Sequence, residues 1–513
     1  MSASSRTARS ITSNWLMLSV NVGVAFFLSP FVVKSLGSVY YGIWALANQF
    51  IGYLYLLDFG VRESVIRYTS KYVARAQPQR LNQVLSTAIM LYVPIAVATV
   101  LMTLVVAWGV SDWFHIPEEN AAEARIAVIF MGLTIAQTFV FNVFTGILQG
   151  LNRFDVGNTI GLGAVIVRTV LVVVLLSQGY KLAALAAVYF ALAVAGGLLG
   201  AFYAIRLLRE AGVRFRFHIP ARRRLRALAG KIFGYGAFVL LNNIAQKIIF
   251  ASDAVIIGAY LGVAKIAPYA IAGTLIDNLR SLMVSTAQVF SPLSSSLFAQ
   301  RRTAEMGELL VRGGKLAVVV TLPIALTFAL LGDVFVHLWM GDEFRVVAGQ
   351  VLLVLGLTQI VSAPHYVVSS VMYGMSQHHI LGYLRICEAV ANLVLSILLV
   401  RKFGVVGVAI GTAISHLIVA AGILPFLISA RLKMRVSQYW WGIYGRTSLA
   451  SLPFLAGLFL MREWVTLSNL FQFFGCIALL CVIYAASIWF MALTSTERDE
   501  LRAHLPWRRA HAA

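Results

Sequence analysis

Long hydrophobic segments alternate with short polar ones along almost the whole chain. An α-helix needs about 20 mostly apolar residues to cross a bilayer. About fourteen segments meet this requirement: 12–33, 40–60, 84–109, 125–147, 158–177, 182–205, 232–260, 267–291, 314–336, 347–372, 380–400, 405–429, 446–461 and 468–492. The pattern therefore predicts an all-α polytopic membrane protein.

The composition narrows the possible classes of protein. Hydrophobic residues make up 60% of the 513 residues and charged residues only 12%, with a mean hydropathy of +0.84. A soluble domain carries about 25% charged residues, so a soluble enzyme, a disordered chain and a disulfide scaffold are excluded. The three cysteines lie in apolar stretches, without the spacing of a metal site. We expect no metal and no cofactor.

The positive charges indicate the orientation of the chain. There are 41 lysine and arginine residues against 20 aspartate and glutamate, concentrated after the second span and between the sixth and seventh. By the positive-inside rule these segments, and both termini, are cytoplasmic. Since the basic residues recur loop by loop, we predict no nucleic-acid partner. The basic run at 222–226 has two interpretations, a topology determinant or a site for anionic membrane lipids.

The chain also resembles itself when it is shifted by about 224 residues, a period that indicates a duplicated unit. The matches are 149–155 with 373–379, Ala164 with Glu388, Arg168 with Asn392 and, one residue further on, 36–37 with 261–262. Six spans separate the copies, so both have the same orientation in the membrane. This predicts two six-helix lobes related by a pseudo-two-fold axis along the membrane normal, followed by two further helices.

These observations divide the chain into six regions. They are a cytoplasmic N-terminus (1–13), an N-lobe (14–207), a basic cytoplasmic linker (208–231), a C-lobe (232–430), two extra spans (431–493) and a cytoplasmic tail (494–513). The first span has no signal-peptidase site, so we expect it to be retained.

Charged groups at membrane depth are costly and therefore indicate function. The basic candidates Arg168, Lys247 and Arg280 favour an anionic cargo, because guanidinium groups bind phosphate with parallel hydrogen bonds. Arg62 and Arg67 could receive a phosphate at the cytoplasmic mouth or serve as topology charges. Asn243 belongs to a polar stripe beside Lys247 and could line a cavity.

Four carboxylates lie in or at the ends of the spans: Asp58, Asp253, Asp277 and Glu388. Any of them could carry a proton or sodium ion that drives transport, and the sequence does not choose among them. Asp277 and Arg280 are three residues apart on a helix, so we predict that they form a pair.

Three segments, 42–46, 56–68 and 148–155, resemble the polysaccharide transporter family of O-antigen and exopolysaccharide repeat-unit flippases, within the superfamily of multidrug, oligosaccharidyl-lipid and polysaccharide exporters. The resemblance implies two lobes around a V-shaped cavity. It implies a cargo of undecaprenyl-pyrophosphate-linked oligosaccharide, moved across the bacterial cytoplasmic (inner) membrane by alternating access. It also implies partners in the polysaccharide polymerase machinery, and it makes Arg168, Lys247 and Arg280 the positions that could hold the pyrophosphate.

Two alternatives come from the same superfamily: a flippase of the lipid II type, which fourteen spans resemble, and a cation-coupled multidrug exporter. A membrane-embedded glycan polymerase or ligase should carry a large external catalytic loop. The longest external loop that the pattern predicts is 111–124. We therefore expect a transporter and not an enzyme.

Overall fold

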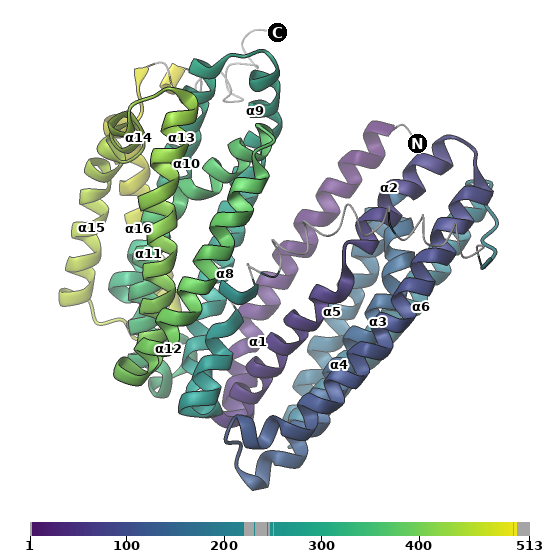
Figure 1. Ribbon diagram of the computed structural model, residues 1–513. Coiled ribbons are helices and arrows are strands. Elements are labelled where there is room, and N and C mark those ends of the chain that lie inside the picture. The colour runs from purple at the N-terminus through teal and green to yellow at the C-terminus, as the bar shows by residue number, and fades with distance from the viewer. Residues whose placement is uncertain are drawn as a thin grey trace. The chain divides into compact units, whose positions relative to one another are not determined.

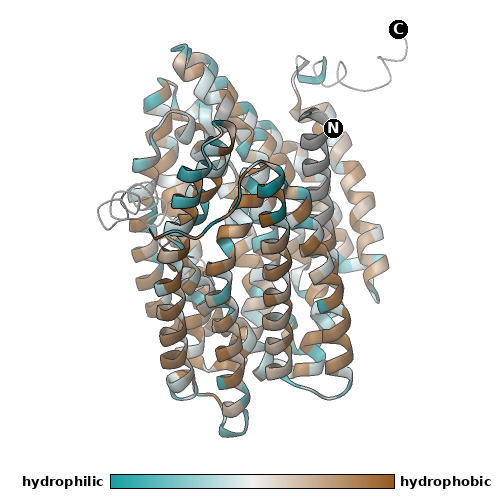
Figure 2. Ribbon diagram, turned by 90° about the vertical axis from the view of Figure 1, so that its right-hand side faces the viewer, coloured by the Kyte–Doolittle hydropathy of each residue, from teal (hydrophilic) through white to brown (hydrophobic). Residues whose placement is uncertain are grey.

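The computed structural model describes residues 3–219, 230, 244, 247–249, 251–495 and 497–499. Within these residues every regular element is helical (Figure 1). The chain forms two compact units, Met1–Ala267 (unit 1) and Pro268–Ala513 (unit 2). Figure 2 shows hydrophobic residues along the middle of the long helices and hydrophilic residues mostly near their ends.

Ten helical segments in the described part of the chain are long and apolar enough to cross a membrane. Two helices hold two predicted spans each, because α1 (Ala3–Leu54) has a non-helical residue at Gly37 and α12 (His378–Leu417) has one at Gly404. The eighth predicted span coincides with α8 (Ile266–Gln288), and most of the seventh lies outside the described residues. An all-α polytopic membrane protein is confirmed.

Unit 1 is a bundle around α4. Its elements after α1 are the 3₁₀ turn η1 (Tyr55–Asp58), α2 (Val61–Ala74), α3 (Pro78–Trp113), α4 (Glu118–Gly150), α5 (Phe154–Ser177), α6 (Leu182–Glu210) and the short η2 (Val263–Lys265). Helix α4 packs against α2, α3 and α6, while α5 packs against α1 and α6. Only helices satisfy all their backbone groups inside an apolar phase, which explains this architecture.

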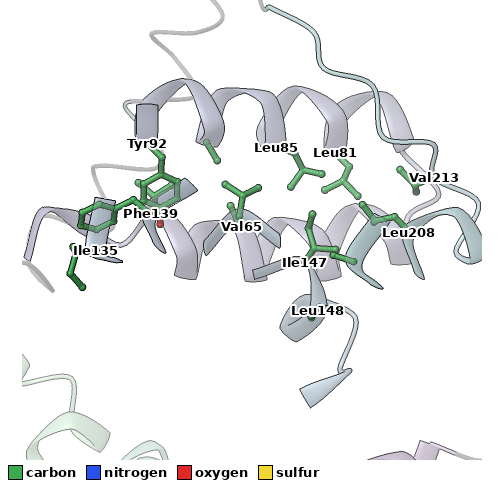
Figure 3. Close-up of a cluster of buried hydrophobic side chains, with 14 of the residues drawn as sticks. Val65, Leu81, Leu85, Tyr92, Ile135, Phe139, Ile147, Leu148, Leu208 and Val213 are labelled. Carbon is green, nitrogen blue, oxygen red and sulfur yellow. The ribbon is translucent and has the colours of Figure 1, made fainter. Parts of the chain in front are cut away.

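The best-packed part of unit 1 lies at the ends of α2, α3 and α4. Figure 3 shows Leu81, Leu85 and Tyr92 of α3 facing Phe139 and Ile147 of α4, all fully buried. The chain that leaves α6 joins this core through Val213, and the Asn82 amide donates to the Arg214 carbonyl at 2.9 Å. The first part of the predicted linker is therefore docked on unit 1.

The prediction of a long external loop at 111–124 is wrong. Helix α3 continues to Trp113 and α4 begins at Glu118, so the connection is only four residues, 114–117. The reason is electrostatic, because Glu118 and Glu119 occupy the first turn of α4, where carboxylates stabilise the positive end of the helix.

Unit 2 is built around α11. Its elements after α8 are α9 (Phe290–Ala299), α10 (Thr303–Met340), α11 (Asp342–Gly374), α12, the π turn η3 (Ile418–Ile423), α13 (Leu424–Leu432), α14 (Val436–Trp440), the π turn η4 (Trp441–Gly445), α15 (Arg446–Trp464), α16 (Leu470–Ser487) and the π turn η5 (Ile488–Ala492). Helix α11 packs against α9, α10 and α12. The predicted pair of extra spans, α15 and α16, packs on α10, where the Tyr484 hydroxyl donates to the Val319 carbonyl at 2.9 Å.

The internal repeat is present in the backbone. After α4, Asn152 has a φ of 55° and its amide donates to the Gln149 carbonyl at 2.9 Å; after α11, Ser376 has a φ of 58° and donates to Tyr373 at 3.0 Å. These positions are 224 residues apart. Two unrelated turns would not share a positive φ at a non-glycine residue and the same hydrogen bond, so the two units contain copies of one helical motif.

Candidate functional site

Arg168 lies on α5 of unit 1. Its guanidinium carbon is 4.7 Å from the ring centroid of Tyr189 on α6. Its Nε is buried and has no hydrogen-bond partner among the described residues. A cation over the face of a tyrosine ring is stabilised by the ring quadrupole. Tyr189 thus holds a cation inside a membrane-spanning pair of helices while leaving donor capacity for an anion.

A groove runs between α5 and α6 beside Arg168. Its volume is about 540 Å³, and it is mainly apolar. Gly163, Ala164, Leu192 and Gly196 form part of its wall, and Arg153 lies at one end. Arg153 is paired with Asp155 at 3.0 Å, so the groove itself presents no unneutralised cation from this pair.

The predicted pair of Asp277 and Arg280 is confirmed. On α8, the Arg280 Nη1 donates to the Asp277 Oδ1 at 2.7 Å. The arginine side chain is only 14% exposed, whereas the aspartate side chain is 65% exposed. Arg280 is therefore the embedded member of the pair, and Asp277 is the accessible one.

Tyr366 on α11 marks where several charges of unit 2 converge. Arg280 of α8 and Arg385 and Glu388 of α12 all act electrostatically on its hydroxyl. The sequence analysis did not select Arg385, because nothing in the sequence distinguishes it from a topology charge near the start of a span. Two guanidinium groups from different helices thus lie around one buried tyrosine.

Glu388 has a partner that the sequence analysis missed. Its Oε1 is 2.6 Å from the Nδ1 of His416, and the two side chains are only 1% and 4% exposed. The ring of His365 on α11 lies 5.4 Å from the His416 ring. The residue spacing gave no signal for this cluster, since 28 residues separate Glu388 from His416.

Lys247 and Asp253 both adjoin α1 in unit 1. The Lys247 Nζ lies so close to Gly52 that a Cβ there would be 2.7 Å away. Asp253 is 3% exposed and acts electrostatically on Tyr53, the next residue of α1. The predicted neighbour of Lys247, Asn243, lies outside the described residues.

Asp58 is held at the break between α1 and α2. Phe59 and Gly60 have φ angles of 49° and 71°, which end the first helix and start the second. Asp58 is buried and accepts a hydrogen bond from the Tyr92 hydroxyl. This explains why a carboxylate lies in the hydrophobic core of unit 1.

Arg62 and Arg67 lie on α2, directly after this break. Arg62 donates to Glu63 at 3.3 Å. Burial alone lowers the pKa of Arg62, but Tyr55, Glu63 and Asp58 outweigh it and raise that pKa above its ordinary value. Arg62 is thus a permanent cation whose charge is already partly balanced.

None of the described residues form a group of three or more metal-ligating side chains. The site residues that both units present are therefore organic charges. They are arginines at membrane depth and carboxylates that are each held by one hydroxyl, imidazole or guanidinium group. Such a set can bind an anion and exchange a proton, and together with the repeated helical motif it defines a membrane transporter.

The family-model comparison gives the identification. The model described as "Polysaccharide biosynthesis protein" matches residues 7–298, more than half of the chain, and the MatE model matches residues 239–398. The chain belongs to the polysaccharide biosynthesis protein family.

Curated relatives and solved structures agree with this assignment. The chain is 21% identical over 385 residues to a protein named as an O-antigen transporter of Shigella flexneri, covering 75% of this chain and 88% of the relative. It is 22% identical over 475 residues to Agl15 of Haloferax volcanii, named as a flippase of low-salt glycan biosynthesis, covering 91% and 92%.

Two solved structures have the same fold. An inward-facing multidrug resistance MATE family transporter of the MOP superfamily has a TM-score of 0.70 at 16% identity, covering 80% of this chain and 95% of that one. The lipid II flippase MurJ in an inward closed conformation has a TM-score of 0.69 at 15% identity, covering 93% and 97%.

Proposed function

We propose that this chain is a flippase that carries an undecaprenyl-pyrophosphate-linked oligosaccharide across the bacterial inner membrane, with both termini in the cytoplasm. Membership of the polysaccharide biosynthesis protein family supports a role in glycan export. The names of the O-antigen transporter and of the glycan flippase Agl15 support a lipid-linked sugar as cargo. Such a protein moves its cargo without covalent chemistry, so it is a transporter and not an enzyme.

The observation that carries the proposal is a guanidinium group embedded at membrane depth in each unit. Arg168 lies over Tyr189, and Arg280 is 14% exposed beside the accessible Asp277. A charge at that depth costs several kcal/mol, on the order of 3 kcal/mol for arginine, unless it has a partner or a function. A pyrophosphate group offers both guanidinium groups oxygen acceptors in the geometry that arginine prefers.

The proposed cycle binds the pyrophosphate from the cytoplasm while the lipid tail stays in the bilayer. Alternating access then exposes the glycan to the other side, where polysaccharide polymerase machinery takes it up. A proton or sodium gradient drives the cycle through one of Asp58, Asp253, Asp277 and Glu388. Lys247, Arg62, Arg67 and Asn243 are the further positions that we assign to the cargo path.

The test is the leaflet on which the cargo accumulates. A deletion strain should accumulate the lipid-linked glycan on the inner leaflet, and wild-type protein should remove it. Arg168→Ala and Arg280→Ala should leave at least about tenfold more cargo there, a loss of about 1.4 kcal/mol of transition-state stabilisation. Arg206→Ala is the matched control, because this exposed arginine is paired with Glu210 at the end of α6. If the glycan never accumulates on the inner leaflet, the proposal fails.

The MatE match over 239–398 favours a second candidate, a cation-coupled exporter of drugs. The same deletion strain distinguishes the two functions. Increased sensitivity to cationic drugs with normal glycan export would replace the flippase by the exporter. The lipid II-type alternative predicts instead that peptidoglycan precursor, and not the exported glycan, accumulates.

A further inference from the structure

Helix α12 forms a tight hairpin of two antiparallel legs. The legs meet at Gly404, whose φ of 59° lies in the region that glycine adopts without strain. Their close approach depends on glycine, because a Cβ on Gly411 would lie 2.7 Å from the backbone nitrogen of Ser396. Small residues at such contacts let membrane helices approach closely. Residues far apart in sequence are thereby brought face to face.

A ladder of polar side chains connects the two legs. The Asn392 amide donates to the Thr412 hydroxyl at 2.9 Å, and one turn further from Gly404 the Glu388 Oε1 is 2.6 Å from the His416 Nδ1. Asn392 and Thr412 are 0% and 3% exposed. A buried polar group is costly unless it is satisfied, so this ladder needs an explanation beyond packing.

The glutamate–histidine pair lies at the middle of the membrane. Glu388 is ten residues beyond the start of α12 at His378, which at 1.5 Å per residue places it about 15 Å into the helix. The hydrocarbon core of a bilayer is about 30 Å thick. The pair is thus equally far from both aqueous phases.

The groups that face the pair come from three helices. His365 and Tyr366 are on α11, Arg385 is on α12 itself, and the Arg280–Asp277 pair on α8 acts on Tyr366. The Glu388 Oε2 and both ring nitrogens of His365 are buried and have no hydrogen-bond partner among the described residues. Each is a site to which a proton can be added or from which one can be passed on.

We propose that Glu388 and His416 form the proton-binding site that couples transport to the proton gradient, with His365 as the neighbouring relay group. This rests on the proposed function and deepens it, since it selects one carboxylate and one ion. In the described part of the chain these side chains do not form a group that could hold a metal ion. Imidazole beside carboxylate is instead the pair whose charge changes near physiological pH.

The proton step is a simple exchange. With one proton shared, the pair is Glu⁻ and His⁺ and has no net charge; a second proton from one aqueous phase binds the carboxylate oxygen and leaves a net charge of +1. That charge faces Arg385 and weakens the link between the two legs of α12. Release of the proton to the opposite phase restores the link, so the hairpin is the two-state element that the gradient biases.

The first test does not depend on the cargo. Infrared difference spectra of the purified protein in liposomes, titrated from pH 5 to 9, should show a protonating carboxyl group in wild type that is lost in Glu388→Gln. His416→Gln should shift its midpoint by at least about one pH unit, as loss of an adjacent charge does. Glu308→Gln is the matched control, because this carboxylate forms an exposed pair with Arg312. A spectrum unchanged in Glu388→Gln would overturn the proposal.

The second test measures coupling. In the same liposomes, a pH gradient should accelerate flipping of undecaprenyl-pyrophosphate-linked glycan by wild type at least about tenfold, while Glu388→Gln and His416→Gln should flip at one rate with or without the gradient. Acceleration by a sodium gradient instead would overturn the proposal. If wild type flips no glycan, the proposed function fails, and the infrared titration still decides whether the proton site exists.

Discussion

The two copies of the repeated motif use one backbone for different chemistry. In unit 2, Glu388 and His416 form a buried pair at 2.6 Å. The positions 224 residues earlier are Ala164 and Leu192, and both line the mainly apolar groove between α5 and α6. The same site in the fold is therefore a filled polar contact in one copy and an open apolar groove in the other.

The next contact along the hairpin differs in the same way. Asn392 is hydrogen-bonded to Thr412 in unit 2, whereas the matching Arg168 in unit 1 lies over the ring of Tyr189. Unit 1 thus presents an embedded cation beside a groove, and unit 2 encloses titratable groups. After duplication, one copy became suited to an anionic lipid and the other to the coupling ion, and their shared backbone did not need to change.

The largest effect should come from giving unit 2 the residues of unit 1. His416→Leu leaves Glu388 as a buried carboxylate without its partner, and breaking a buried pair in this way costs about 3–5 kcal/mol of unfolding free energy. Adding Glu388→Ala should recover most of this loss, because no charge then remains. Denaturant unfolding in detergent measures both variants.

The exposed pair of Glu308 and Arg312 provides the control for this experiment. Arg312→Leu should change the unfolding free energy by less than about 1 kcal/mol, because both side chains are solvated. If His416→Leu costs no more than Arg312→Leu, the pair is not enclosed as the structure describes. The comparison between the two copies would then lose its basis.

The sequence could predict the arrangement of spans, the repeat and the pair of Asp277 and Arg280, because each depends on local periodicity or on a constant shift. It could not predict the contact of Glu388 with His416. That contact depends on where Gly404 reverses the chain and on how closely Gly411 lets the legs approach. The loop at 111–124 was mispredicted for a related reason, since its acidic residues stabilise the end of a helix as well as a solvated loop.

A smaller effect should separate the close hairpin of unit 2 from the open groove of unit 1. A Cβ on Gly411 would meet the Ser396 backbone at 2.7 Å, so Gly411→Ala should destabilise by about 1–3 kcal/mol through overpacking. Gly163 has nothing within 4 Å of a Cβ, so Gly163→Ala should stabilise by up to about 1 kcal/mol through helix propensity. Thermal unfolding in detergent compares the two, and equal effects would contradict the difference in packing.

The smallest effect concerns the contact between Arg168 and Tyr189. A double-mutant cycle with Arg168→Gln and Tyr189→Leu isolates this interaction from the packing that each side chain makes on its own. We expect a coupling free energy of about 0.5–1 kcal/mol, as for a cation over an aromatic ring that water still reaches. Tyr189→Phe keeps the ring and should preserve the coupling with Arg168. A coupling near zero would mean that the ring does not stabilise the cation, and the embedded charge of unit 1 would then depend on its anionic cargo alone.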